Sequence, residues 1–192
     1  MGRATLPQSE FEMQRRFRST DLEHLFNTCF LASQGTRLVG GAAEPFYAPA
    51  TPDHPATIFY TRDYFRSALH EIAHWCVAGR ARRRLPDFGY WYAADGRDAD
   101  QQARFQQVET RPQAFELLFC AAVGHPFRVS LDNLSGDATD PGPFEEAVWR
   151  RAVALTEQGV GGRAGCWVEC LADEYRRESF RPAWLEDVFL RW

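Results

Sequence analysis

The sequence predicts an α+β fold, a mostly helical single domain with a small β-sheet. Two observations lead to this prediction: apolar residues recur at helical spacing over most of the chain, and extended apolar runs are confined to residues 38–60. One domain over residues 1–192 is expected because a chain of this length, 45% hydrophobic, can bury a single core. Residues 20–134 are expected to form the core with the functional site, and residues 135–192 a C-terminal helical layer.

Composition and charge exclude several classes of protein. The residue usage is not that of a disordered, collagen-like or disulfide-scaffold chain. The net charge is -4, and no apolar run reaches about 18 residues, so neither nucleic-acid binding nor a membrane span is expected. The five cysteines include no C-x-x-C pair, and the N-terminal residues lack the apolar run of a signal peptide. Together these features favour a reducing, cytoplasmic location.

The helices and strands are predicted from capping residues, glycines and apolar periods. Thr20 and Glu23 have the spacing of a capping box at the start of a first helix, and Gly35 ends it. Thr110 and Gln113 have the same spacing at the start of a later helix. The expected order is a helix from residue 20, an extended segment over 38–47, a strand over 56–60, a helix from 61 or 63 to 78, an irregular connection over 80–102, a helix over 110–124, a linker over 135–143, and helices over 144–158, 164–177 and near 184.

His70, Glu71 and His74 give the strongest chemical signal, an H-E-x-x-H motif on a predicted helix. Residues i and i+4 lie one turn apart on the same face, so both imidazoles can reach one metal ion. At about 100° per residue, His70, His74 and Glu71 lie about 140°, 180° and 240° from Phe65. The apolar stripe of this helix consists of Phe65, Ala68, Leu69, Ile72, Ala73 and Cys76. We therefore expect the histidines to face away from the core, in a zincin-like arrangement of a strand leading into the motif helix.

Two imidazoles need a third protein ligand, which is often a carboxylate in zinc and non-haem iron sites. Glu109 and Glu116 are the leading candidates. Glu109 lies just ahead of the predicted capping box, where a polar side chain can turn inward, whereas Glu116 also fits the solvent face of an amphipathic helix. Periodicity does not decide between them. The weaker candidates are Asp95, Asp98, Asp100 and His125.

Other features give weaker signals. The D-F-G sequence at residues 87–89 is not accompanied by a Gly-rich loop or a catalytic-loop motif, so we assign it no function. The aromatic residues at 90–92 suit either a pocket wall or ordinary core packing. Cys166 and Cys170 share a helix face without a matching ligand pair and are expected to be buried thiols.

Arginines at positions 80, 82, 83 and 84 follow the motif helix. One interpretation is that they balance the negative charge at the C-terminus of that helix. The other is that Arg80, Arg82, Arg83 and Arg84 form a docking patch for an acidic partner.

Three separate segments resemble the bacterial elongation factor P hydroxylase family. They are TRLVGGAAEPFYAP, IFYTRDYFRSALHEIAHWCVAG and DFGYWYAADGRDADQQARFQQVETRPQAFELLFC. They agree with the family in order and spacing, beyond the H-E-x-x-H motif itself. The resemblance covers about residues 20–134 and is loose from residue 135 onward.

The resemblance implies a cytoplasmic protein-lysine hydroxylase, an oxidoreductase of the monooxygenase type acting on the lysylated lysine of elongation factor P. It places a two-histidine, one-carboxylate metal site on His70, His74 and Glu109, and so favours Glu109 over Glu116. A triad with open positions is what non-haem Fe(II) uses to bind oxygen. Glu71 would then support the ligands or move protons. The implied partners are elongation factor P and molecular oxygen, without membrane or nucleic acid.

Two alternatives use the same residues. In a zinc metallopeptidase, His70 and His74 bind zinc and Glu71 is the general base for a bound water. In a non-catalytic module that binds a translation factor, the metal serves structure only, and a fourth protein ligand would close the site.

Overall fold

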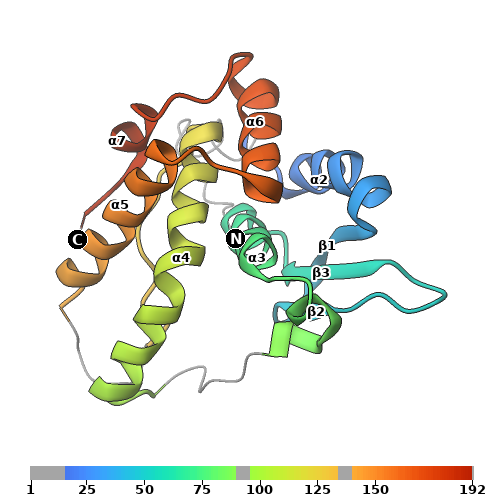
Figure 1. Cartoon of the computed structure of the whole chain (residues 1–192), viewed down its shortest axis with the longest axis horizontal. Coiled ribbons are helices and arrows are strands. Elements are labelled where there is room, and N and C mark those ends of the chain that lie inside the picture. Colours follow the sequence, from blue (N-terminus) through green and yellow to red (C-terminus); the bar gives the residue numbers. More distant parts are fainter. Residues whose placement is uncertain (1–15, 90–95, 134–139, 192) are drawn as a thin grey trace, which may run out of the picture.

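A three-stranded sheet on one side and a group of helices around the long helix α4 on the other make up the fold (Figure 1). The computed structural model describes residues 16–89, 96–133 and 140–191. The elements are α2 (Ser19–Gln34), β1 (Thr36–Ala42), β2 (Phe46–Ala48), β3 (Ala56–Thr61), α3 (Phe65–Val77), the 3-10 turns η1 (Arg82–Arg84) and η2 (Pro86–Gly89), α4 (Ala99–Val123), α5 (Gly142–Glu157), α6 (Gly162–Arg176) and α7 (Trp184–Val188). The predicted α+β class, mostly helical with a small sheet, is confirmed.

The sheet has the strand order β1-β3-β2. The central strand β3 pairs in parallel with β1 and antiparallel with β2. The predicted strand at residues 56–60 is β3, and the segment predicted as extended over 38–47 contains most of β2 and most of β1. A short turn leads from β3 into α3, which also packs against β3. This strand–helix unit places the H-E-x-x-H motif next to the sheet.

Helix α2 is tied to the sheet by the residue that was expected to cap it. The predicted capping box of Thr20 and Glu23 is wrong, because the helix begins at Ser19 and its N-cap residue makes no side-chain cap. The Glu23 carboxylate instead accepts hydrogen bonds from the Gly40 amide (3.0 Å) and the Tyr60 hydroxyl (3.3 Å). Glu23 thus connects α2 to β1 and β3.

Helix α4 begins eleven residues earlier than the predicted start at residue 110. Its capping box is formed by Asp98 and Gln101, which exchange hydrogen bonds of 2.8 and 3.1 Å. Thr110 lies inside the helix and donates to the Gln106 carbonyl. Pro112 also lies inside the helix, which tolerates it although proline usually interrupts one. As a result, the irregular connection expected over residues 80–102 ends at residue 98.

The C-terminal helices lie close to their predicted positions. Helix α5 starts at Gly142, so the last residues of the predicted linker over 135–143 belong to a helix, and residues 134–139 lie outside the described part of the chain. Helices α5, α6 and α7 all pack against α4. Their buried apolar residues belong to the same cluster as those of α2, α3 and β3.

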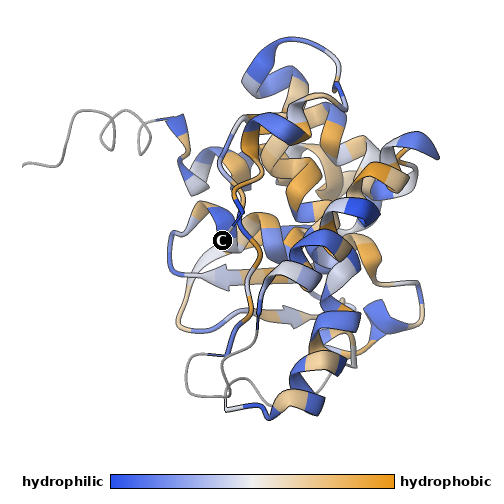
Figure 2. Ribbon diagram, turned by 90° about the vertical axis from the view of Figure 1, so that its left-hand side faces the viewer, coloured by the Kyte–Doolittle hydropathy of each residue, from blue (hydrophilic) through white to orange (hydrophobic). Residues whose placement is uncertain are grey.

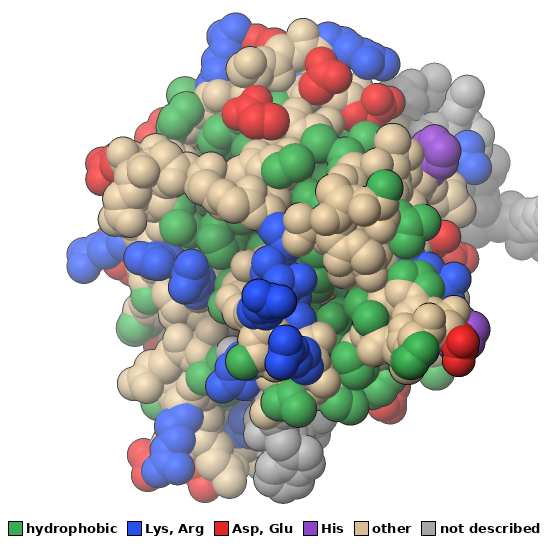
Figure 3. All heavy atoms as spheres, turned by 45° about the vertical axis from the view of Figure 1, so that its right-hand side comes forward, with side chains coloured by type: hydrophobic (Ala, Val, Ile, Leu, Met, Phe, Trp, Pro, Cys, Tyr) green, Lys and Arg blue, Asp and Glu red, His purple; other side chains and the backbone are tan. Residues whose placement is uncertain are grey.

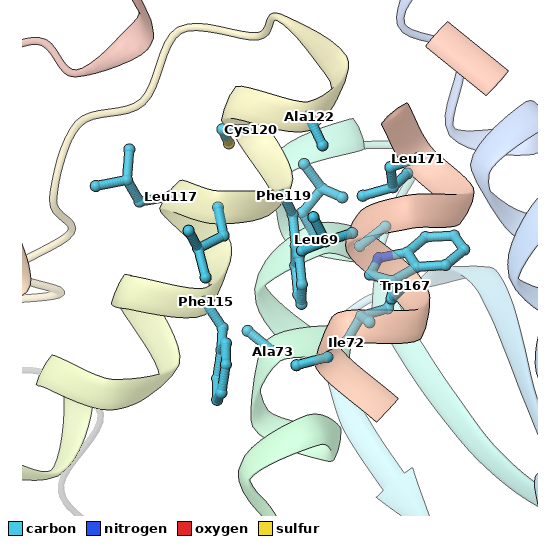
Figure 4. Close-up of a cluster of buried hydrophobic side chains, with 14 of the residues drawn as sticks. Leu69, Ile72, Ala73, Phe115, Leu117, Phe119, Cys120, Ala122, Trp167 and Leu171 are labelled. Carbon is cyan, nitrogen blue, oxygen red and sulfur yellow. The ribbon is translucent and has the colours of Figure 1, made fainter. Parts of the chain in front are cut away.

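The core lies between α3, α4 and α6. Figure 2 shows the hydrophobic faces of the helices turned inward and the hydrophilic faces outward. Side chains from these three helices interdigitate in Figure 4, with Leu69 and Ile72 from α3, Phe119 from α4, and Trp167 and Leu171 from α6. A second aromatic group locks α2 onto this core through ring contacts of 4.9–5.9 Å, and its members are Phe26, Phe30, Trp75 and Trp167. The motif helix is thereby fixed on its apolar side.

Candidate metal centre

The two motif histidines lie on the side of α3 opposite its core contacts, as predicted. Five residues of the predicted apolar stripe are buried and Cys76 is partly buried. His70 and His74 are partly buried, with 19% and 13% of their side chains exposed, and they face α4. Their Nε2 atoms lie 3.1 Å apart. The spacing of one helical turn therefore brings one nitrogen of each imidazole close to the other.

Glu109 of α4 completes a three-residue group. Its carboxylate oxygens lie 3.3 Å from His74 Nε2 and 3.7 Å from His70 Nε2. Histidine, cysteine, aspartate and glutamate are the side chains that commonly bind metal ions. Within the described residues, one group of three or more of them has ligand atoms close enough to hold an ion, and it consists of His70, His74 and Glu109. Glu109 is 1% exposed, and its Oε2 atom is buried without a hydrogen-bond partner. An orphaned buried oxygen facing two imidazoles is what a metal ligand looks like without its ion.

Glu116 has a different place in the site. It is also 1% exposed, so the interpretation as a solvent-facing residue is wrong. Its Oε2 accepts a 2.9 Å hydrogen bond from His70 Nδ1, and its Oε1 accepts from the Arg66 guanidinium at 2.7 and 3.1 Å. Once His70 loses its second proton, the hydrogen bond from Nδ1 leaves the Nε2 lone pair directed toward His74 and Glu109. Glu116 thus lies on the Nδ1 side of the His70 ring and outside the group formed by His70, His74 and Glu109.

The charges of these groups are strongly coupled. Burial by itself would lower the pKa of His70, but Glu116, Glu109 and Glu71 outweigh it and raise that pKa to about 10. Burial would raise the pKa of Glu109, yet His74 and His70 lower it to about 2. The pKa of Glu116 is lowered, because Arg66 and then His70 oppose the effect of burial. The site is therefore rich in ionised carboxylates, which attract a cation as well as protons.

Glu71 borders a cavity of about 280 Å³ beside the centre. It is partly buried, and its pKa is raised because burial, supported by Glu109 and Asp87, outweighs the two histidines. A carboxyl group with a raised pKa next to a candidate metal centre is suited to hold or release a proton. The cavity is lined by Pro45, Arg66, Ser67, His70, Glu71, Glu116, Ser130 and Asp132.

The weaker ligand candidates are not brought to the site. Asp98 caps α4, and Asp100 is exposed in its first turn. The His125 ring packs between Phe17 and Phe65, at ring distances of 4.8 and 5.6 Å. Asp95 and the aromatic residues 90–92 lie outside the described residues.

Two other sequence features have structural explanations. The D-F-G segment supports β2, because Asp87 accepts a hydrogen bond from the Tyr47 amide (2.7 Å) and Phe88 stacks on the Tyr47 ring. Cys166 is exposed, so the expectation of a buried thiol is wrong for it. Cys170 is partly buried and contacts Cys29 of α2, with their sulfurs 2.9 Å apart.

The C-terminus of α3 is stabilised by a residue that the sequence did not single out. Arg163 of α6 donates to the carbonyls of Trp75, Cys76 and Ala78 at 2.7–3.2 Å. The expectation that the arginines at 80–84 balance the negative charge at this end of the helix concerns charge and not hydrogen bonds, and it stays a prediction. Burial and then Arg83 lower the pKa of Arg163, so these two cations lie near each other. Figure 3 shows basic side chains gathered at the centre of one face.

The sequence of this chain is similar to known proteins over most of its length. The sequence model of the elongation factor P hydroxylases matches residues 25–184. The chain is 43% identical over 160 residues to the elongation factor P lysine hydroxylase of Haemophilus influenzae, an alignment that covers 83% of this chain and 90% of that protein. The similarity therefore runs beyond residue 134 through α5 and α6. Among the described residues, no helix has the length and apolarity that a membrane span requires.

Proposed function

The chain belongs to the elongation factor P hydroxylase family, and we propose that it hydroxylates the lysylated lysine of elongation factor P with a divalent metal held by His70, His74 and Glu109. The observation that carries the proposal is the convergence of these three side chains around the buried, unpaired Oε2 of Glu109. We further propose that the metal is Fe(II), because two imidazoles and one carboxylate with open positions suit a non-haem iron centre.

The residues present fit such a metal. The imidazoles can both offer Nε2, and Glu109 supplies negative charge in a place where burial would otherwise disfavour it. A fourth protein ligand is not found among the described residues, which leaves room for oxygen or water and argues against a purely structural metal. When bound, ferrous iron supplies the activation of molecular oxygen.

The protein residues around the centre have separable tasks. Glu116 and Arg66 hold the His70 ring so that Nε2 stays available. Glu71 lies beside the cavity with a raised pKa, so its carboxyl group can take up a proton and release it to the centre. The cavity receives the substrate side chain next to His70 and keeps the reacting carbon near the metal ligands.

Hydroxylation inserts one oxygen atom of O₂ into a C–H bond, and the second atom becomes water with two electrons and two protons from a reductant. The test therefore combines the purified protein with ferrous iron, ascorbate, air and lysylated elongation factor P. Intact-mass analysis should show that the factor gains one oxygen atom. All 22 basic residues other than histidine are arginines in this chain, so a product on lysine cannot come from the enzyme itself.

Controls separate hydroxylation from other chemistry. The His70→Ala variant and a reaction without oxygen should give no product, because each lacks one required component. Cleavage of the factor or of a peptide panel in the absence of oxygen would overturn the proposal in favour of a zinc peptidase. Binding of the factor without any mass change under all conditions would also overturn it.

A further inference from the structure

One wall of the cavity is a short segment, residues 129–133, which we call the strap. It follows α4 in the chain after the turn at Gly124. Ser130 and Asp132 of the strap line the cavity together with His70 and Glu71. The strap therefore lies where a substrate side chain that approaches the metal centre would pass.

Buried polar side chains hold the backbone of the strap. Gln113 of α4 is fully buried, and its amide donates to the Ser130 carbonyl and accepts from the Ser130 amide, both at 2.9 Å. The Arg97 side chain, 2% exposed, donates to the carbonyls of Leu131 and Asp132. Buried hydrogen bonds of this kind are costly to break, so the strap is a rigid wall.

Asp132 has a conformation that this framework imposes. Its φ angle is 45°, in the left-handed region that few residues other than glycine adopt. Its carboxylate accepts a 2.6 Å hydrogen bond from the Ser130 hydroxyl, and the side chain remains exposed to the cavity side of the strap. The carboxylate is thus fixed in direction and is still available to a ligand.

Three carboxylates line the cavity, those of Glu71, Glu116 and Asp132. The two basic side chains among the described lining residues, Arg66 and His70, both bond to Glu116, whereas Asp132 accepts from the neutral Ser130 hydroxyl. The Asp132 carboxylate therefore favours a positively charged ligand. A primary ammonium carries its charge at neutral pH and has three donors for carboxylate oxygens.

We infer that Asp132 is a specificity-determining residue that binds an ammonium group of the lysine-derived side chain while its carbon is hydroxylated. The inference rests on the proposed function, since that function supplies the cationic substrate. In this arrangement the rigid strap sets the distance between the charged end of the substrate and the metal ligands. A neutral side chain would leave the carboxylate without a partner and would bind more weakly.

The test compares the wild type with Asp132→Asn. Asparagine tolerates a positive φ angle and can still accept from Ser130, so the backbone should not change. Because a hydrogen bond to a charged group is commonly worth about tenfold in affinity, KM for the modified factor should rise about tenfold while kcat changes less than about threefold. Metal binding should remain equal to that of the wild type. Asp53→Asn, an equivalent charge change in the exposed loop before β3, is the matched control.

A second arm changes the substrate instead of the enzyme. Acetylation of the terminal amines of the factor's modified lysine should weaken its binding to the wild type but have little further effect on Asp132→Asn, because both changes remove the same interaction. Equal KM values for the wild type and Asp132→Asn, or an acetylation effect of the same size in both, would overturn the inference while the hydroxylase function stands. A wild type without hydroxylase activity would refute the proposed function itself, and this inference with it.

Discussion

Replacement of Glu116 by glutamine tests the division of labour between the two buried glutamates. The carboxylate accepts from His70 Nδ1 at 2.9 Å and from Arg66 at 2.7 Å. A neutral amide has one acceptor oxygen and cannot satisfy both donors as the carboxylate does. We expect the His70 ring to lose its fixed orientation while all three proposed metal ligands stay in the protein.

The expected magnitude follows from these contacts. Loss of the group that orients a metal-bound histidine typically lowers metal affinity about 10- to 100-fold. Breaking a buried ion pair typically costs about 3–5 kcal/mol, but the Arg66 side chain is 36% exposed and water screens it. We therefore expect a loss of about 1–3 kcal/mol in the free energy of unfolding of the metal-free protein.

Metal titration and urea unfolding separate the two effects. Arg66→Gln is the matched control, because it removes the ion pair but leaves the bond between Glu116 and His70. It should lose stability similarly and metal affinity much less. In the His70→Ala background, Glu116→Gln should have almost no additional effect on metal affinity. Unchanged metal affinity in Glu116→Gln, or an equal loss in Arg66→Gln, would show that Glu116 serves stability alone.

Three further predictions concern pH, charge and proton transfer. The pKa of His70 is raised from 6.5 to about 10 and that of Glu109 lowered from 4.5 to about 2, so the metal-free fold should lose stability as pH rises from 6.5 through 10 or falls from 4.5 through 2. Urea unfolding across this range measures it, and a flat profile would contradict the assigned charges. Changing Arg82, Arg83 and Arg84 to serine should lower the association rate with the factor and flatten its salt dependence in stopped-flow mixing. An unchanged salt dependence would show that these arginines are only solvated. Glu71→Gln should still bind metal but hydroxylate more slowly, by up to about 100-fold if it delivers a proton, and full activity would exclude that role.

The elements that the sequence predicted best are those whose signal is a periodic apolar pattern. The stripe on α3 correctly predicted which face the histidines occupy, since core burial alone determines that face. Helix starts were predicted less well, because a capping box is only a spacing of residue types. The pair at Thr20 and Glu23 matches that spacing, but Glu23 has better partners in Gly40 and Tyr60, which are distant in sequence.

The choice between Glu109 and Glu116 could not be made from spacing for a related reason. The prediction that a helix starts at residue 110 placed Glu109 outside it, whereas the two glutamates lie seven residues apart on one helix. Positions seven apart share a face, so both turn toward α3. What distinguishes them is the direction of the His70 ring, which depends on Arg66 and on tertiary packing.

Helix α4 carries a signal that could have located the site. Gln102, Glu109, Gln113 and Glu116 follow one another at intervals of seven, four and three, which is a helical stripe, and each is at most 1% exposed. A polar stripe on a buried helix needs partners, because unpaired buried polar groups are costly. In this protein Glu109 faces the two histidines. Gln113 bonds to the strap. Glu116 bonds to Arg66 and His70. One rigid helix thus fixes a proposed metal ligand, the group that orients another ligand, and the wall proposed to bind the substrate. A shift of α4 would consequently change metal affinity and substrate affinity together, whereas Asp132→Asn at the far end of this network should change substrate affinity alone.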